Sequence, residues 1–189
     1  MRICVFCSSS DAAGEVYTSA ATAMGALIGQ GGHTLVYGGG RVGLMWATAR
    51  AVHQNGGRVI GVIPTFMNRP GVPYLECDEL TFTKDMRERK ALMIELSEAF
   101  IALPGGFGTL EELSEVITLK QFGFLNGPLL AVNTAGFYDP LAAFFEGFYQ
   151  QSFAKPAFRA TCQFVAAPAD AMAYIAGYTP PPLTSKWFT

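Results

Sequence analysis

The stretch "AFIALPGGFGTLEELSEVITLKQF", residues 99–122, carries the clearest signal of the fold expected of this chain. It begins with five apolar residues, passes through a loop with three glycines in four positions, and ends in a helical pattern over 109–122. A buried strand, a glycine-rich loop and a helix in this order are typical of proteins built on a parallel sheet. We therefore expect residues 99–103 to form a strand of such a sheet.

The same alternation of apolar runs and helical patterns extends to both sides of this stretch. It predicts a single doubly wound, mostly parallel sheet with helices on both faces, that is, a Rossmann-like α/β fold. Residues 1–178 should form one domain, followed by a Pro-rich tail at 179–189 without regular structure. Residues 67–83, with two prolines, should form an irregular connection. The remaining strands are expected at 2–7, 33–37, 58–64, 127–133 and 162–168, and the remaining helices at 17–30, 42–55, 85–98, 139–151 and 169–176.

The composition excludes several classes of protein. Half of the 189 residues are hydrophobic and 15% are charged, which opposes a disordered chain. The formal net charge of -2 gives no reason to expect binding to nucleic acid or to an anionic membrane. No apolar run approaches the ~20 residues of a membrane span. The first residues, "MRICVFCSSSDAAG", lack the pattern of a signal peptide, so we expect a cytoplasmic protein.

Two of the four cysteines, Cys4 and Cys7, form a CxxC sequence inside the first expected strand. Residues three apart on a strand point to opposite faces of the sheet, whereas a redox CxxC normally opens a helix. A chain with reduced cysteines is therefore the favoured interpretation, ahead of a redox or metal site. The two histidines, His33 and His53, do not suggest a ligand cluster either.

Two glycine-rich loops, "GGGRVG" at 38–43 and "PGGFG" at 104–108, each follow an expected strand. The backbone N–H groups of such a loop and the positive end of the next helix dipole suit a phosphate, although glycines can also merely make turns. The first loop formally matches a dinucleotide fingerprint, but no Asp or Glu lies between this loop and Glu76, so the acid expected near the end of the next strand is absent and NAD binding is disfavoured. Neither loop has the GK[ST] of a P-loop.

Arg89 and Lys90 break the apolar pattern of the helix expected at 85–98. Arg89 falls on the same inward stripe as Met86 and Met93, and Lys90 borders it. A cation on an apolar face is costly unless it is paired or faces a ligand. Arg89 should therefore contact a ligand or form a salt bridge, for example to Glu112 or Glu115.

Glu112 has two interpretations. Thr109 and Glu112 have the spacing of a capping box, in which the glutamate reaches back to the start of its helix. Leu110, Leu113 and Ile117 would mark the buried side of that helix, which places Glu112 at its flank, overlooking the site. A carboxylate beside a phosphate is useful if it faces a part of the ligand that becomes positive.

Three motifs together resemble those of the LOG ("Lonely guy") family, formerly described as possible lysine decarboxylases: "PGGFGTLEE" (104–112), "MRERK" (86–90) and "YGGGRVGLM" (37–45). The resemblance covers most of the chain. It implies a homodimeric Rossmann-like enzyme that needs no cofactor or metal. Such enzymes hydrolyse the N-glycosidic bond of cytokinin riboside 5′-monophosphates, and often of AMP, to free base and ribose 5-phosphate.

Carried over by motif, the resemblance implies that Arg89 and Glu112 are the catalytic pair. Phosphate would lie against "GGFGT", with the ribose toward Glu112. The carboxylate would stabilise an oxocarbenium-like sugar cation or orient the attacking water, while Arg89 would position the phosphate or Glu112. The implied nucleotide contacts are Gly39, Gly40, Met45, Arg89, Lys90, Gly105, Gly106, Phe107, Gly108, Thr109, Leu110, Glu111 and Thr118.

Some positions depart from the family pattern and affect the expected base preference. Trp46 stands where glycine is usual, Gly127 stands where plant members have lysine, and the loop at 67–83 matches poorly. Two other functions remain open. A nucleotide-binding or sensing module without turnover is opposed by the presence of both Arg89 and Glu112. An amino-acid decarboxylase would need a Schiff-base lysine with pyridoxal phosphate, for which the sequence offers no signal.

Overall fold

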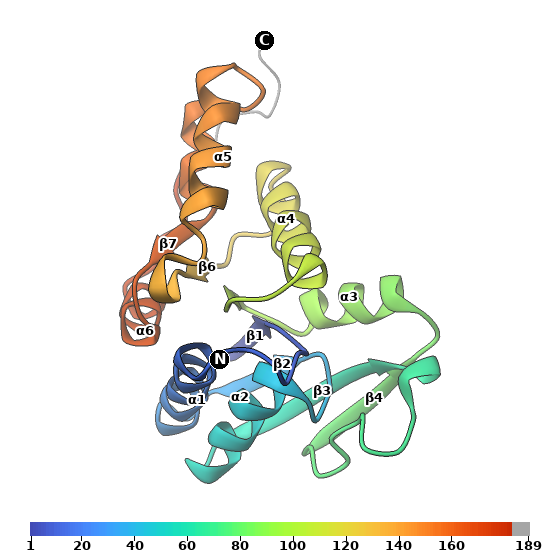
Figure 1. The fold of residues 1–189 in the computed structure, drawn as a ribbon. Helices are drawn as coiled ribbons and strands as arrows, with labels where there is room; N and C mark the ends of the chain where they lie inside the picture. Colours follow the sequence, from blue (N-terminus) through green and yellow to red (C-terminus); the bar gives the residue numbers. More distant parts are fainter. Residues whose placement is uncertain (183–189) are drawn as a thin grey trace.

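The computed structural model describes residues 1–182; residues 183–189, which include most of the expected Pro-rich tail, lie outside the described part (Figure 1). A seven-stranded sheet in the order β4-β3-β2-β1-β5-β6-β7 forms the centre, and every neighbouring pair of strands is parallel. The predicted doubly wound parallel sheet is confirmed. The strands are β1 (Arg2–Phe6), β2 (Thr34–Tyr37), β3 (Arg58–Pro64), β4 (Glu79–Thr83), β5 (Ala99–Ala102), β6 (Leu129–Val132) and β7 (Gln163–Val165).

Helices cover both faces of the sheet, as predicted. The helices are α1 (Glu15–Gln30), α2 (Gly43–Gln54), α3 (Met86–Glu95), α4 (Phe107–Gln121), α5 (Asp139–Gln150) and α6 (Pro168–Ala176), with short 3-10 turns η1 (Thr65–Met67), η2 (Thr134–Gly136) and η3 (Pro156–Thr161). Among residues 1–182, no helix is both long and apolar enough to cross a membrane.

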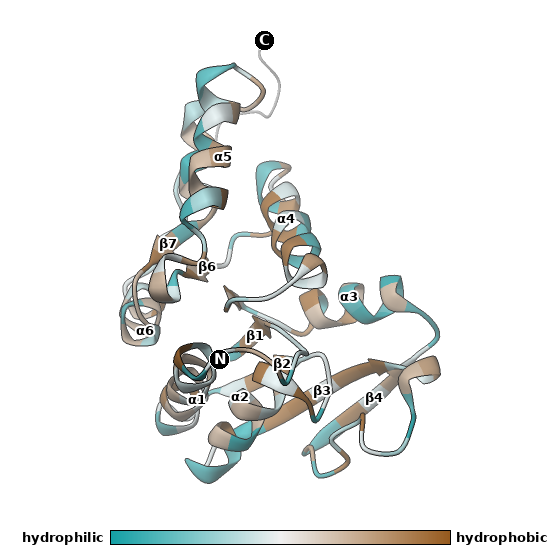
Figure 2. Ribbon diagram, viewed as in Figure 1, coloured by the Kyte–Doolittle hydropathy of each residue, from teal (hydrophilic) through white to brown (hydrophobic). Residues whose placement is uncertain are grey.

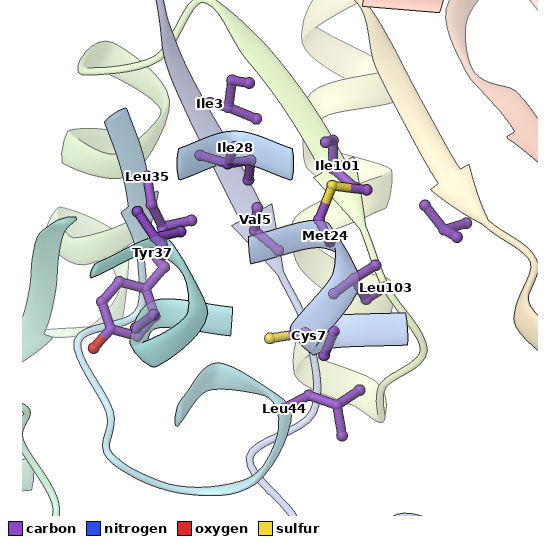
Figure 3. Close-up of a cluster of buried hydrophobic side chains, with 14 of the residues drawn as sticks. Ile3, Val5, Cys7, Met24, Ile28, Leu35, Tyr37, Leu44, Ile101 and Leu103 are labelled. Atoms are coloured by element: carbon purple, nitrogen blue, oxygen red, sulfur yellow. The ribbon is translucent and has the colours of Figure 1, made fainter. Parts of the chain in front are cut away.

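The sheet separates two hydrophobic cores. In the first core, Ile3 and Val5 of β1 pack with Met24 and Ile28 of α1 (Figure 3). The second core, on the other face, joins the sheet to α3, α4 and the chain around α5. Figure 2 shows apolar colour concentrated in the strands, with mixed colours in the helices. This distribution is expected of a parallel sheet that is covered on both faces.

The predicted orientation of the CxxC cysteines is confirmed. Cys4 lies in the second core and Cys7 in the first, so the two side chains point to opposite faces of the sheet. All four cysteines of the chain are free. Burial raises the pKa of both thiols well above its ordinary value, so neither is a reactive thiolate.

The connection predicted at 67–83 is wrong in its last five residues, because Glu79–Thr83 form strand β4. This strand pairs in parallel with β3 at one edge of the sheet, with Glu79 opposite Ile60. Its sequence, ELTFT, alternates polar and apolar residues, and four of its five side chains are at least partly exposed. An edge strand does not need the continuous apolar run that identified the central strands.

Helices α1 and α2 pack closely because two glycines of α1 face α2. A Cβ atom on Gly25 would lie 2.3 Å from the carbonyl oxygen of Thr48 and 2.8 Å from Cβ of Ala51. A Cβ atom on Gly29 would lie 2.7 Å from the carbonyl oxygen of Val52. These separations are too short for real carbon atoms, so the helices can approach this closely only with glycine at both positions.

We expect Gly25→Ala to lower the free energy of unfolding by about 1–3 kcal/mol, because the added methyl group must push two backbones apart. Gly147→Ala is the matched control, since Gly147 also lies inside a helix but has no atom within 4 Å of a built Cβ. That change should raise stability by about 0.5–1 kcal/mol through helix propensity. Urea denaturation of both variants measures the difference, and equal effects would contradict the close-packing argument.

Candidate active site

The two glycine-rich loops meet at the carboxyl edge of the sheet, beside the end of β1. The backbone N–H of Ser8, just after β1, donates to the carbonyl of Pro104 at 3.2 Å. The carbonyl of Ser8 in turn accepts from the N–H of Leu44 at 3.0 Å. The chain order reverses at β1, which pairs with both β2 and β5. In open α/β sheets this reversal point is where ligands bind.

Helix α4 begins at Phe107, two residues earlier than predicted, with Gly106 as its N-cap and no capping side chain. Thr109 is therefore the third residue of the helix, and its side chain is buried. The predicted capping box between Thr109 and Glu112 is wrong for this reason. The first backbone N–H groups of a helix have no partner within the helix, so the start of α4 presents donors and the positive end of its dipole.

The buried side of α4 also differs from the predicted one. Leu110, predicted to face inward, is 39% exposed, whereas Glu112 is only 7% exposed. Glu112 therefore lies on the buried side, next to Leu113 and Val116, and not at the flank. A carboxyl group in this position is removed from most of the solvent.

Arg89 lies on the buried side of α3, as predicted, and is 8% exposed. Its Nε donates to the carbonyl oxygen of Val62 at 3.1 Å, and its Nη1 donates to Oε1 of Glu112 at 3.3 Å. The salt bridge considered from the sequence is thus present. It joins the two residues that were predicted to be the catalytic pair.

Burial dominates the electrostatics of Glu112. It raises the pKa of this carboxyl to about 7, even though the Arg89 guanidinium lowers it. Near neutral pH the group can therefore gain or lose a proton readily. A carboxyl of this kind can act as a general base or can supply negative charge to a reacting centre.

Lys90 and Glu111, both predicted as nucleotide contacts, are paired with each other. The ammonium group of Lys90 contacts the carboxylate of Glu111, and it lies 3.0 Å from Oε2 of Glu115. Burial alone would lower the pKa of Lys90, but its bonds to the two carboxylates raise the pKa above its ordinary value. Lys90 is therefore a cation at neutral pH and stands beside the N-terminal turns of α4.

Of the other predicted nucleotide contacts, all but one lie near the Arg89–Glu112 pair. Gly39 accepts the N–H of Tyr74 at 2.9 Å, and Met45 packs beside Gly40, so this loop is covered by the segment around Tyr74. Gly105 to Leu110 surround the start of α4. Thr118 is exposed and lies nine residues beyond Thr109, about 13 Å along the helix. The structure therefore does not bring Thr118 together with the other site residues.

Two contacts of the site could not have been found from sequence motifs. The carbonyl of Val62 holds the Arg89 side chain, and Ser8 links the two glycine loops. Both act through main-chain atoms, which every residue type possesses. The serines after the first expected strand are a weak signal at most.

A cavity of about 900 Å³ lies along the outer flank of α4, away from Arg89 and Glu112. Its walls come from α4, from α5 and from the chain at 153–164, and its lining includes Phe145, Phe148 and Phe153. Figure 1 shows α4 and α5 as neighbouring columns. We call this cavity the α4–α5 groove; it is a separate feature from the candidate catalytic site.

No group of three or more His, Cys, Asp and Glu side chains within residues 1–182 is arranged to hold a metal ion. The functional groups that the described chain gathers at the sheet edge are a carboxyl, a guanidinium, an ammonium and backbone N–H groups. These groups suit a small anionic ligand with a reactive centre near the carboxyl.

Comparisons with known proteins agree on one family. A family model described as "Possible lysine decarboxylase" matches residues 45–175. The chain is 40% identical over 179 residues to a probable cytokinin riboside 5′-monophosphate phosphoribohydrolase of Oryza sativa subsp. japonica, covering 95% of this chain and 73% of the rice protein. It is 42% identical over 167 residues to a cytokinin riboside 5′-monophosphate phosphoribohydrolase of Arabidopsis thaliana, covering 88% and 72%.

Solved structures share the fold at lower sequence identity. The molybdenum cofactor carrier protein from Chlamydomonas reinhardtii superposes with a TM-score of 0.71 at 22% identity, covering 93% of this chain and 95% of the other. The molybdenum cofactor binding protein from Rippkaea orientalis gives a TM-score of 0.71 at 21% identity, covering 93% and 94%. At such identities the likeness concerns the fold alone.

Glu112 should make stability depend on pH. Its folded-state pKa is about 7 and its ordinary value is 4.5, so between these values the folded protein holds a proton that the unfolded chain has released. The free energy of unfolding contributed by this group should therefore fall as pH rises from 5 to 8. Melting temperatures of the wild type and Glu112→Gln measure this, because glutamine does not titrate. The wild type should lose stability relative to the variant across this range, and a constant difference would contradict the raised pKa.

Proposed function

Because the chain belongs to the LOG family, whose model carries the description "Possible lysine decarboxylase" and whose matched relatives are phosphoribohydrolases, we propose that it hydrolyses the N-glycosidic bond of nucleoside 5′-monophosphates. The substrates are cytokinin riboside 5′-monophosphates, AMP or both, and the products are free base and ribose 5-phosphate. The observation that carries this proposal is the buried Arg89–Glu112 pair beside the N-terminus of α4.

The 5′-phosphate binds at the start of α4. The backbone N–H groups of 105–109 donate to its oxygens, and the helix dipole favours its negative charge. Lys90, which stands beside this turn, adds a positive charge once Glu111 gives way to the phosphate. Phe107 is 92% exposed at the same place and is available to the rest of the nucleotide.

Glu112 acts on the sugar. As the bond between C1′ and the base breaks, its electron pair leaves with the base and positive charge develops on the ribose. The Glu112 carboxylate stabilises this charge, and it accepts a proton from the water that bonds to C1′. The departing base takes up one proton from the solvent, and Glu112 afterwards releases the proton it accepted from water, so atoms and charge balance.

Arg89 is a positioning group and an electrostatic group in this reaction. A guanidinium stays protonated at all relevant pH values, so it is a poor general acid. It holds the carboxyl of Glu112 by a direct hydrogen bond and lowers its pKa, which keeps a useful fraction of the group ionised near neutrality.

The four free cysteines agree with a reducing compartment, and we place the enzyme in the cytoplasm.

We further propose that the enzyme is a homodimer that buries the α4–α5 groove. Helix α5 has no fully buried residue within the described chain, and Phe153, which lines the groove, is 77% exposed. An apolar surface of this kind on a compact protein marks an interface. A second copy of the chain supplies a matching apolar surface, because a two-fold contact joins the same patch to itself.

A panel of nucleoside 5′-monophosphates tests the reaction. The wild type should release free base from AMP or from a cytokinin riboside 5′-monophosphate. Glu112→Gln should lower kcat by about 10²–10³-fold, by comparison with the loss of one preorganised electrostatic group, while nucleotide binding survives. Chromatography of the base and calorimetry of binding give the two readouts. Binding without base release by the wild type would favour the sensing module instead.

Light scattering tests the dimer. The wild type should have twice the mass of one chain at micromolar concentration, and Phe153→Glu should have the mass of a monomer, because a charge would be buried in the interface. Phe66→Glu is the matched control: Phe66 is 56% exposed but lies on η1, outside the groove. A monomeric wild type, or a dimeric Phe153→Glu variant, would refute the proposed interface.

A further inference from the structure

Gly38, the first residue after β2, is buried and lies against the side chain of Arg89. A Cβ atom built on Gly38 would lie 1.7 Å from Nη2 of Arg89 and 2.9 Å from its Cζ. Ordinary van der Waals contact begins at about 3.4 Å. The guanidinium therefore occupies the space that any side chain at position 38 would need.

A different physical constraint acts at each of the three consecutive glycines of this loop, Gly38, Gly39 and Gly40. Gly39 has a φ of +70°, a backbone conformation that disfavours other residues. A Cβ on Gly40 would meet Cε of Met45 at 2.6 Å, which is the end of a flexible side chain. Gly38 has no positive φ, so its backbone would accept alanine. Its principal constraint is the Arg89 guanidinium.

We infer that Gly38 is a positioning residue for the proposed reaction: by lacking a side chain, it lets the guanidinium of Arg89 lie against the end of β2 and bond Glu112. This inference rests on the proposed function for its catalytic meaning. Nε of Arg89 is held by Val62 on β3, and Nη1 bonds Glu112 on α4. The absence of a side chain at Gly38 leaves the space that the guanidinium occupies.

A methyl group at position 38 would disturb the pair while leaving the fold intact. The atoms it meets first belong to the far end of a long side chain, which can move without moving the backbone. Nη2 would have to shift by ~1.7 Å or more to reach ordinary contact distance. The bond from Nη1 to Oε1 of Glu112 is already 3.3 Å long, so such a shift breaks it.

Loss of this bond would leave Glu112 without its nearest cation. The charged and titratable groups that act on Glu112 come from three elements: Arg89 and Lys90 on α3, Glu111 and Glu115 on α4, and the thiols Cys4 and Cys7 at β1. Arg89 lowers the pKa of Glu112 more than Lys90 does. Its displacement should therefore raise the pKa of Glu112 and reduce the ionised fraction at neutral pH.

The test is Gly38→Ala, measured for base release from AMP and for melting temperature. The variant should keep a melting temperature close to that of the wild type, lose about 10²-fold in kcat, and show the acidic limb of its pH–rate profile at higher pH. Gly177→Ala is the control, because its added Cβ would meet only the Ala173 carbonyl, at 3.8 Å. It should retain wild-type kcat. Unchanged kcat in Gly38→Ala would overturn the inference.

A double-mutant cycle with Arg89→Ala separates positioning from a general disturbance. Without the guanidinium there is nothing for the methyl group to displace, so Gly38→Ala should change kcat less than twofold in that background. An equal loss in both backgrounds would contradict the inference.

A crystal structure of Gly38→Ala decides the matter even if no substrate is found for the wild type. Failure of the wild type to release any base would refute the proposed function. The crystal structure of the variant would still show whether the methyl group displaces the guanidinium of Arg89. A separation beyond 4 Å between Nη1 of Arg89 and Oε1 of Glu112 would support the role of Gly38. An unmoved guanidinium would refute it.

Discussion

Strand β1 pairs in parallel with both β2 and β5, and the arrangement of the whole site depends on this double pairing. Cys4 lies opposite Val36 on one side and opposite Phe100 on the other. Since all three strands run in the same direction, the loops that follow them leave from one edge of the sheet. Ser8 then ties the loop after β5 to the start of α2 through its own main-chain atoms. Segments far apart in the chain thus form one surface.

Two opposite charges are buried at this edge, and their presence is better explained by function than by stability. The side chains of Arg89 and Glu112 are each only 9% exposed. Removing two such charges from water costs several kcal/mol per ion, and a buried pair of this kind often adds no net stability over apolar residues of the same size. Burial also brings the pKa of Glu112 to about 7. Burying the pair therefore lowers the stability of the fold somewhat, and it yields a carboxyl group that gains or loses a proton near neutral pH.

Helix α4 connects the catalytic site to the α4–α5 groove. Its first turns carry Glu112 and the backbone N–H groups that we propose to bind phosphate, and its later turns line the groove through Ile117 and Gln121. At its C-terminal end, the buried ammonium of Lys120 bonds the carbonyl of Gly127 and donates to the hydroxyl of Tyr178 at 3.1 Å. Helix α4 therefore carries Glu112 near one end and is held at its other end by the contacts of Lys120.

The sequence predicts the order of the central strands and helices, the two glycine loops after strands, and the inward position of Arg89, because these features depend on local periodicity and on burial. The family motifs further identified Arg89 and Glu112 as the residues to inspect. Only the tertiary structure revealed β4, since an edge strand pairs through its backbone and needs no apolar run.

The tertiary structure also placed the start of α4 at Phe107, because a glycine-rich segment can begin a helix at several residues and packing selects one. Packing against the sheet likewise put Glu112 on the buried side of this helix. Packing also determined which groups contact the side chain of Arg89. Arg89 bonds the main-chain carbonyl of Val62 and occupies the space beside Gly38. Neither contact can be predicted from the pattern of side chains in the sequence. They arise only when elements that are distant in sequence pack together.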